Sequence, residues 1–331
     1  MADLATVAEP AAGTPRRRLV PSVPLLVTVG LVGVAVVVAL IRTGSPATVR
    51  QAVLTGLLLG GVYGLVALGL TLIFGVLDIV NFAHGALLTV AMYVTYTLSD
   101  RFGIDPYVSL LVAVPLLFLL GAALQRGLID RTLGQPLENQ LLLTLGIALL
   151  LENALLLSYG GVPKTVNPSY DEPVRVLSAV ADLSRILAFL GALAIAGLLY
   201  VLLQRTRLGT AIRAVAANPR GAQLVGVDVR FIFMLTFAIG TACAGAAGVL
   251  VVPFVTVEPT IGELFNIVAF VVVVLGGLGS VPGAVLGGLV IGLTEQLGGI
   301  IFPSQSPLLS VFFVFVLVLF LRPQGIFGRR Q

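Results

Sequence analysis

Long apolar segments divide this sequence, and few charged residues interrupt them. Ten such segments lie near 19–41, 51–75, 80–98, 107–124, 138–159, 185–203, 231–253, 264–278, 283–302 and 307–321. A helix needs about 20 apolar residues to cross the hydrocarbon core of a bilayer, and two segments, 264–278 and 307–321, are shorter than that. We therefore predict an all-α, polytopic transmembrane helical bundle with about eight to ten helices.

The composition argues against a soluble globular fold. Of the 331 residues, 58% are hydrophobic and 10% are charged, whereas an average soluble domain has about 25% charged residues. The 38 glycines suit closely packed membrane helices. The net charge of +4 comes from basic residues that are scattered between apolar segments, so contact with a lipid bilayer explains it better than nucleic-acid binding does.

The basic residues favour one orientation in the membrane. With the N-terminus inside and ten crossings, thirteen of the nineteen Lys and Arg residues are cytoplasmic and six are external, as the positive-inside rule expects. Residues 1–18 then form a cytoplasmic tail, and 19–45 hold a first transmembrane helix, which is too long for a typical signal peptide. Both termini and the loops 125–137 and 204–230 are predicted to be cytoplasmic, and 160–184 to be external.

The loop 204–230 carries five arginines against one aspartate. Its sequence predicts a helix, a break and a second short helix, because Asn218 can cap a helix and Pro219 suits the first helical position. Gly226 suits the end of that short helix. A surface helix of this kind could dock a membrane subunit into a soluble partner; the alternative is an ordinary basic connector.

A polar cluster interrupts the apolar sequence after the second segment. Asp78, Asn81 and the only histidine, His84, share one face if this stretch is helical. Polar side chains at membrane depth are costly and usually face a cavity or a partner. We predict that Asn81 and His84, with Phe82 and Gly85, form a wall of a solute pathway. The alternatives are hydrogen-bonded helix packing and an interfacial turn where Asp78 meets water.

A second interruption contains four glycines and a proline within ten residues, which excludes an unbroken helix there. Broken backbone at membrane depth must be buried in protein or line a cavity. Gly277, Gly279 and Ser280 are therefore further candidates for the pathway, unless this stretch is a tight turn between two helices. The two interruptions occur in corresponding halves, 51–159 and 231–321, which predicts internal repeats and broken helices.

Small residues recur at spacing four, which predicts close helix packing. They are Gly56, Gly60 and Gly64; Gly240, Ala244 and Gly248; and Gly288 and Gly292. Glu152 and Glu295 lie in or near apolar segments, and we favour a structural role for them over solute contact.

The motifs of enzymes are missing. The chain has no G-x-x-x-x-G-K-[ST] phosphate loop, no G-x-S-x-G elbow and no H-E-x-x-H pair, so it is not expected to hydrolyse ATP or to hold a catalytic or metal site. The single Cys243 lies in an apolar stretch and is expected to be a packing residue.

Several stretches, taken together, resemble the branched-chain amino acid ABC permease family, LivH type, a binding-protein-dependent transport system. They are 63–75 (YGLVALGLTLIFG) running on to 80–85 (VNFAHG); 209–214 (GTAIRA) with Asn218-Pro219 and Gly226-Val227; 276–284 (GGLGSVPGA); and 322–328 (RPQGIFG). The resemblance covers about 50–331 in order.

The resemblance implies that 46–331 is an importer permease domain and that 204–230 docks the ATPase. The docking residues would be Arg213, Asn218, Pro219, Arg220 and Gly226. It also implies a second, related permease, two ATPase subunits that use ATP and Mg, and an extracytoplasmic solute-binding protein, at a bacterial inner membrane. No cofactor is expected on this chain itself.

The implied substrates are branched-chain or other hydrophobic amino acids, although similar permeases serve urea and short-amide importers. The competing class is an ion-coupled secondary transporter, which would need intramembrane charges such as Asp78, His84, Glu152 or Glu295. LivH-type members begin near the equivalent of residue 51, so the helix within 19–45 is an addition here.

Overall fold

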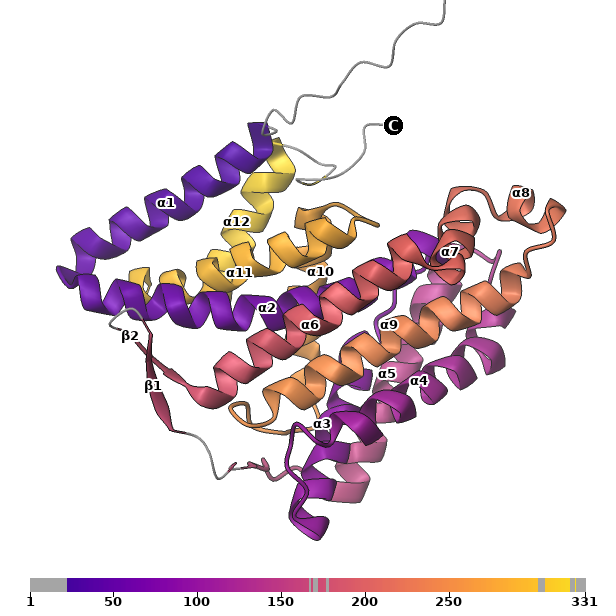
Figure 1. Cartoon of the computed structure of the whole chain (residues 1–331), viewed down its shortest axis with the longest axis horizontal. Helices are drawn as coiled ribbons and strands as arrows, with labels where there is room; N and C mark the ends of the chain where they lie inside the picture. The colour runs from indigo at the N-terminus through magenta and orange to yellow at the C-terminus, as the bar shows by residue number, and fades with distance from the viewer. Residues whose placement is uncertain are drawn as a thin grey trace, which may run out of the picture.

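The computed structural model describes residues 23–166, 168, 172–176, 179–302, 307–321 and 325. The tail predicted at 1–18 lies outside them. The elements are α1 (Val23–Thr43), α2 (Pro46–Leu77), α3 (His84–Phe102), α4 (Leu110–Gly127), η1 (Ile129–Arg131), α5 (Leu137–Tyr159), β1 (Pro173–Val176), β2 (Ala179–Asp182), α6 (Leu183–Arg205), α7 (Arg207–Ala217), α8 (Pro219–Leu224), α9 (Val229–Val251), α10 (Ile261–Gly276), α11 (Val281–Ile301) and α12 (Pro307–Leu321) (Figure 1).

Each of the ten predicted apolar segments contains one long helix, which confirms an all-α polytopic protein. Among the described residues, six helices are long and apolar enough to cross a membrane: α2, α4, α5, α6, α9 and α11. The helices α10 and α12 have 16 and 15 residues, in agreement with the short length of their apolar segments. α2 begins earlier than its apolar segment because Ser45 caps it and Pro46 starts it.

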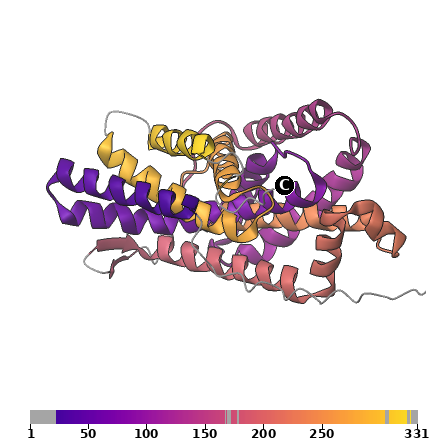
Figure 2. The ribbon, with the colours of Figure 1, turned by 90° about the horizontal axis from the view of Figure 1, so that it is seen from above.

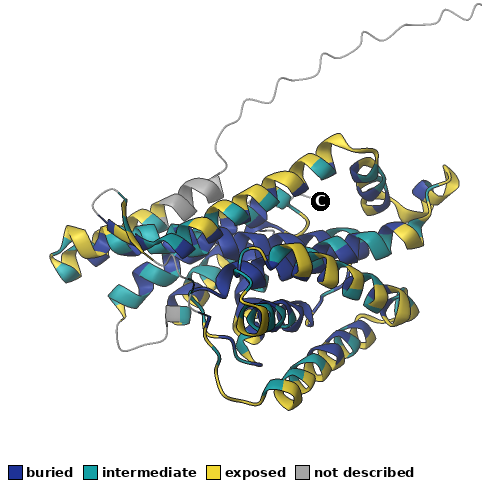
Figure 3. Ribbon diagram, turned by 60° about the horizontal axis from the view of Figure 1, so that its bottom comes forward, coloured by how far each residue is buried: buried dark blue, intermediate teal, exposed yellow. Residues whose placement is uncertain are grey.

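Two helices form the centre of the bundle. The protein buries 83% of the residues in the most apolar stretch of α2 and 78% of those in α9. In the corresponding stretch of α5 only 17% of the residues are buried. The central helices are therefore covered by the protein itself, and outer helices such as α4, α5 and α6 turn apolar side chains outward, as a hydrocarbon solvent allows (Figure 3).

Glycines let α11 lie directly along α2 (Figure 2). A Cβ atom on Gly56 would lie 2.8 Å from the carbonyl oxygen of Gly292, and one on Gly60 would lie 2.8 Å from that of Gly288. The two small-residue stripes predicted from the sequence thus pack against each other, as they do in closely associated membrane helices.

The two halves of the chain contact each other reciprocally. α2 packs on α11 as α4 packs on α9, and α3 packs on α9 as α10 packs on α2. Two glycine pairs, Gly69 with Gly240 and Gly85 with Gly262, each meet backbone against backbone. Such mutual contacts are those of a twofold arrangement, with α2–α4 and α9–α11 as corresponding units, shorter than the predicted halves 51–159 and 231–321. The break between α2 and α3 then corresponds to the break between α9 and α10, and not to the glycine-rich interruption at 276–283, which lies between α10 and α11.

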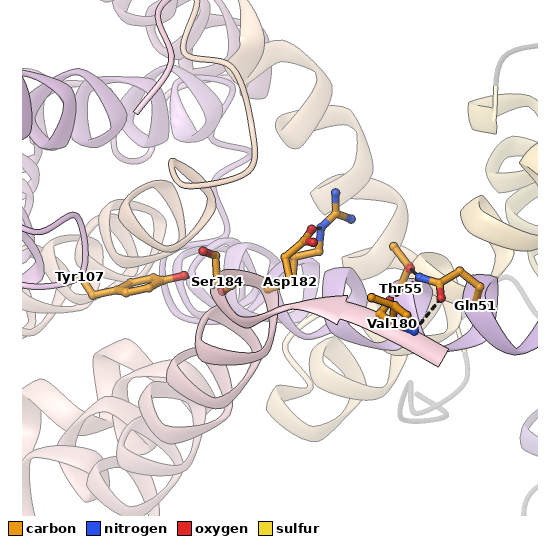
Figure 4. Close-up of polar contacts among 7 residues, drawn as sticks. Gln51, Thr55, Tyr107, Val180, Asp182 and Ser184 are labelled. Carbon is orange, nitrogen blue, oxygen red and sulfur yellow. Dashed lines mark hydrogen bonds and ion pairs between the residues drawn. The ribbon is translucent and has the colours of Figure 1, made fainter. Parts of the chain in front are cut away.

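A β-hairpin, which the sequence did not predict, lies in the loop before α6. Strands β1 and β2 pair in antiparallel fashion. The Gln51 side chain on α2 contacts both backbone groups of Val180: its Oε1 accepts from the Val180 N–H at 2.9 Å, and its Nε2 donates to the Val180 carbonyl. The Tyr107 hydroxyl donates to the carbonyl of Ser184 (Figure 4). Hydrogen bonds from Gln51 on α2 and from Tyr107 before α4 thus position the hairpin and the start of α6.

Candidate translocation and docking sites

The backbone between α2 and α3 is not helical, which corrects one detail of the sequence-based prediction. Asp78 has φ 56°, in the left-handed region, and its N–H caps α2 by donating to the carbonyl of Phe74. Helix α3 begins only at His84. Asp78, Asn81 and His84 therefore do not share a helical face, because the chain leaves the helix at the first of them.

The segment 78–83 runs back along α2. His84 Nε2 donates to the carbonyl oxygen of Val66 at 3.0 Å, and Val66 precedes the last residue of α2 by about 16 Å at 1.5 Å per residue. Six residues of extended chain can cover that distance. Since Val66 lies within a helix that is long and apolar enough to cross a membrane, α3 starts alongside α2 rather than beyond its end, which is a broken-helix arrangement.

Side chains from two other helices satisfy the backbone of this segment. Thr144 Oγ1 on α5 can donate to the carbonyl of Val80 at 3.3 Å or to that of Leu141 in its own helix at 3.1 Å. Asn266 Nδ2 on α10 donates to the carbonyl of Phe82 at 3.1 Å. Non-helical backbone at membrane depth requires such partners. The sequence reasoning missed both residues, although a lone Asn within the apolar segment 264–278 was a usable signal.

His84 and Asn81 are fully buried. The His84 ring lies between α2 and α3 and packs against Gly69. A Cβ atom added at Gly69 would lie 3.0 Å from Cε1 of His84. Asn81 Oδ1 accepts from the N–H of Ala83 at 3.1 Å. The His84 side chain thus holds the start of α3 against α2, whereas Asn81 stabilises the turn before α3 from within the segment.

A cavity of about 220 Å³ opens beside this segment, between α3, α5 and α10. Its polar residues are Glu152, Glu263 and Asn266. The Phe82 ring lines it and packs against Phe270, with the ring centroids 5.3 Å apart. The remaining walls are Ala86, Leu145, Ala148, Leu149, Gly262 and Ile267.

The predicted pathway residues separate into three places. Phe82 lines the cavity. Asn81, His84 and Gly85 lie behind it in the packed interior. Gly277, Gly279 and Ser280 lie beyond the opposite end of α10, in a tight turn where Ser280 caps α11.

That turn lies against the end of α2. A Cβ on Gly75 would be 3.0 Å from Gly279 Cα. Gly277 and Gly279 have φ 93° and 78°, a conformation that glycine adopts without steric cost. This stretch is therefore a tight turn between α10 and α11, which was the alternative expected for it from the sequence.

The loop between α6 and α9 has the predicted helix–break–helix form. Asn218 Oδ1 accepts from the N–H of Gly221 at 2.9 Å and caps α8, and Pro219 is its first residue. Gly226 has φ 88°. Buried residues of α7, such as Ile212 and Val215, pack this helix onto the bundle, and Figure 1 shows α7 and α8 at the opposite end of α6 from the hairpin.

The tip of this loop exposes apolar side chains. Leu224 is 89% exposed and Val225 is 79% exposed. The predicted docking residues Arg213, Asn218 and Arg220, on α7 and at the start of α8, are also exposed. Apolar residues at the tip of a polar loop, rimmed by charge, are typical of a surface that a partner protein covers.

The two glutamates in or near apolar segments differ in their surroundings. Glu295 on α11 lies beside the Tyr63 hydroxyl on α2, near the glycine contacts between these helices. Glu152 instead lines the cavity.

Comparison with known proteins gives a consistent result. A family model described as branched-chain amino acid transport system / permease component matches residues 52–321. The permease protein BraD of Pseudomonas aeruginosa, from a high-affinity branched-chain amino acid transport system, is 33% identical over 296 residues, which cover 85% of this chain and 96% of BraD. The corresponding protein LivH of Escherichia coli K12 is 31% identical over 302 residues, with the same coverage. No solved structure matches. With most of its length matched by the family model, this chain belongs to the family of branched-chain amino acid transport system permease components.

Proposed function

We propose that this chain forms the membrane pathway of an ATP-driven importer for branched-chain or other hydrophobic amino acids. Its partners would be a second, related permease, two ATPase subunits that use ATP and Mg, and an extracytoplasmic binding protein. The relatives BraD and LivH, named as branched-chain amino acid permeases, support the substrate class. The protein would lie in a bacterial inner membrane with both termini in the cytoplasm.

The observation that carries the proposal is the α7–α8 loop. The sequence holds no phosphate-binding loop, so the work of ATP hydrolysis must arrive through a contact with another subunit. Leu224 and Val225 present the exposed apolar surface for that contact, and Arg213 and Arg220 supply charge around it. Arg213 lies on α7, whereas Asn218, Pro219 and Arg220 start α8 and Gly226 follows it, so the proposed contact involves both short helices.

We further propose that 46–331 is the permease domain and that α1 is an added transmembrane helix. The family model begins at residue 52, after α1. Ala39 of α1 is fully buried in a cluster with Val49 and Ala52 of α2 and Leu297 of α11, so α1 packs on the outside of the α2–α11 pair.

The test is reconstitution of the whole importer in proteoliposomes, with leucine as the solute. We expect leucine uptake only with ATP, both ATPase subunits and the binding protein. Uptake driven by an imposed ion gradient in vesicles that hold this chain alone would contradict the proposal and favour an ion-coupled carrier. Uptake of urea but not of leucine would keep the ATP-driven mechanism and reject the substrate class.

A further inference from the structure

Two carboxylates face the cavity between α3, α5 and α10 without a counter-charge. Glu152 lies on α5 and Glu263 in the first turn of α10. Neither forms a hydrogen bond or ion pair with any residue that the structure describes. Carboxylates at or near membrane depth are costly unless a partner or water meets them. Their side of the cavity is therefore built to meet something other than lipid.

Asn266 gives an independent sign of a ligand. Its side chain is 8% exposed, and its Oδ1 has no hydrogen-bond partner among the described residues. The amide cannot be turned over freely, because Nδ2 is held by the carbonyl of Phe82 at 3.1 Å. Oδ1 is thereby fixed as an acceptor at the cavity. A buried acceptor left unpaired is destabilising, so a ligand donor that reaches it would relieve that cost.

The polar groups of the cavity are therefore all acceptors. Two carboxylates and one amide oxygen match a group that carries several N–H donors and a positive charge, and an ammonium has three such donors. Much of the remaining lining is apolar and includes Leu145, Leu149, Ile267 and the rings of Phe82 and Phe270. At about 220 Å³, the cavity is smaller than the roughly 300–1,000 Å³ of pockets for drug-sized ligands.

We propose that this cavity is a binding site for the ammonium end of a small solute with a branched apolar chain. Glu152, Glu263 and Asn266 Oδ1 take the ammonium, and the walls around Phe82 take the hydrocarbon. The solute carboxylate points out of the cavity, away from the two glutamates. This site deepens the proposed function and rests on it: it favours amino acids over urea and short amides, whose N–H donors are neutral and form no charge-assisted hydrogen bond with the carboxylates.

Binding to the assembled permease–ATPase complex in nanodiscs, without the binding protein, tests the site. The probe is radiolabelled leucine, and the competitors are 3-methylbutylamine, 4-methylpentanoate and urea. We expect the amine to displace leucine at concentrations within about threefold of leucine itself. The acid and urea should be weaker by about tenfold or more, which is the loss of one charge-assisted hydrogen bond. Equal competition by the amine and the acid would overturn the proposal.

Charge-removing variants test the two glutamates separately. Glu152→Gln and Glu263→Gln should each weaken leucine binding by about tenfold or more, and Glu138→Gln, an exposed glutamate at the start of the same helix α5, should not. Because Glu263 is exposed, its variant should assemble even if the Glu152 variant does not. Unchanged leucine affinity in Glu263→Gln, or leucine binding that requires Na⁺ and ignores the amine, would refute the site.

Failure of the broader proposal gives a different pattern. If the wild-type importer shows no ATP-driven leucine uptake but the amine still binds the complex, the proposed function is wrong and the ammonium site remains. If uptake is normal and the amine has no advantage over the acid, the site is wrong and the proposed function remains.

Discussion

At the scale of single residues, Phe82 and His84 lie two positions apart in the sequence but differ in how far their side chains are buried. His84 is fully buried, with its ring bonded to α2, whereas Phe82 is 38% exposed and lines the cavity. Sequence position alone does not separate them, since both belong to the stretch VNFAHG. Their substitutions should therefore fail in different ways.

His84→Leu removes the hydrogen bond to the carbonyl of Val66 and should lower stability by about 1–2 kcal/mol. We expect less assembled complex and a lower melting temperature in detergent, with leucine uptake per assembled complex close to wild type. Phe82→Ala, the matched variant, should reverse this pattern, with uptake per complex reduced several-fold. Reduced uptake by fully stable His84→Leu complexes would instead place His84 on the pathway.

At the scale of elements, the pairing of α2 with α11 depends on the absence of side chains. Gly60 and Gly288 meet backbone to backbone, so the helix axes approach closely, and van der Waals packing and not hydrophobic burial holds them together within lipid. The outer helix α5 carries Gly146, which offers a contrast. A Cβ atom at Gly146 would point into open space, with no neighbouring atom within 4 Å apart from the backbone of α5 itself.

Gly60→Ala should destabilise the bundle by about 1–3 kcal/mol, because the new methyl group meets helix backbone that cannot move aside. Gly146→Ala should be neutral or slightly stabilising, since alanine is the better helix former by up to about 1 kcal/mol. Thermal unfolding of both purified variants checks this. Equal melting temperatures would show that the α2–α11 contact is looser than the structure has it.

The α7–α8 loop is the second element with a separable role. Gly226→Leu places a side chain at φ 88°, a conformation that costs an L-residue about 1–2 kcal/mol, in open space away from the membrane core. We expect normal membrane insertion but weaker co-purification with ATPase subunits, or ATP hydrolysis uncoupled from transport.

The control is Gly134→Leu. Gly134 has φ 81° and equally open surroundings, but it lies in the loop between α4 and α5. It should bear a similar strain and keep its ATPase subunits. Loss of ATPase binding in both variants would mean that backbone strain, and not the docking surface, causes the effect.

At the scale of the whole molecule, the chain consists of two corresponding helical units that pack against each other, with further helices and a β-hairpin around them. The units α2–α4 and α9–α11 meet through Gly69–Gly240 and Gly85–Gly262. The hairpin before α6 and the α7–α8 loop lie at opposite ends of α6 (Figure 1). If the proposed orientation holds, the hairpin faces the proposed binding protein and the α7–α8 loop faces the proposed ATPase subunits.

Cysteine labelling tests that orientation. In a Cys243→Ala background, Val162→Cys should react with an impermeant maleimide on intact cells, because Val162 is 68% exposed in the loop predicted to be external. Ala217→Cys, exposed at the end of α7, should react only after permeabilisation. Labelling of Ala217→Cys on intact cells would reverse the predicted topology.

The sequence by itself determined that the chain lies in a lipid bilayer, where its helices lie, and the helix–break–helix form of the loop 204–230. Apolar runs of about 20 residues can only be helices in a bilayer, and capping signals such as Asn218-Pro219 act within one turn of the chain. The glycine stripes likewise indicate, from the spacing within one helix, which face of that helix can pack closely against another. These are local properties, so they can be read before the fold is known.

Only the tertiary structure decided which polar residues meet. Asn266 lies 184 residues from Phe82 in the chain, and nothing near either one indicates that they bond. The non-helical course of 78–83 also depends on distant partners, since Thr144 and Asn266 satisfy carbonyls that would otherwise favour a continued helix. Glu152 and Glu263 line one cavity because α5 and α10 come together beside that broken segment.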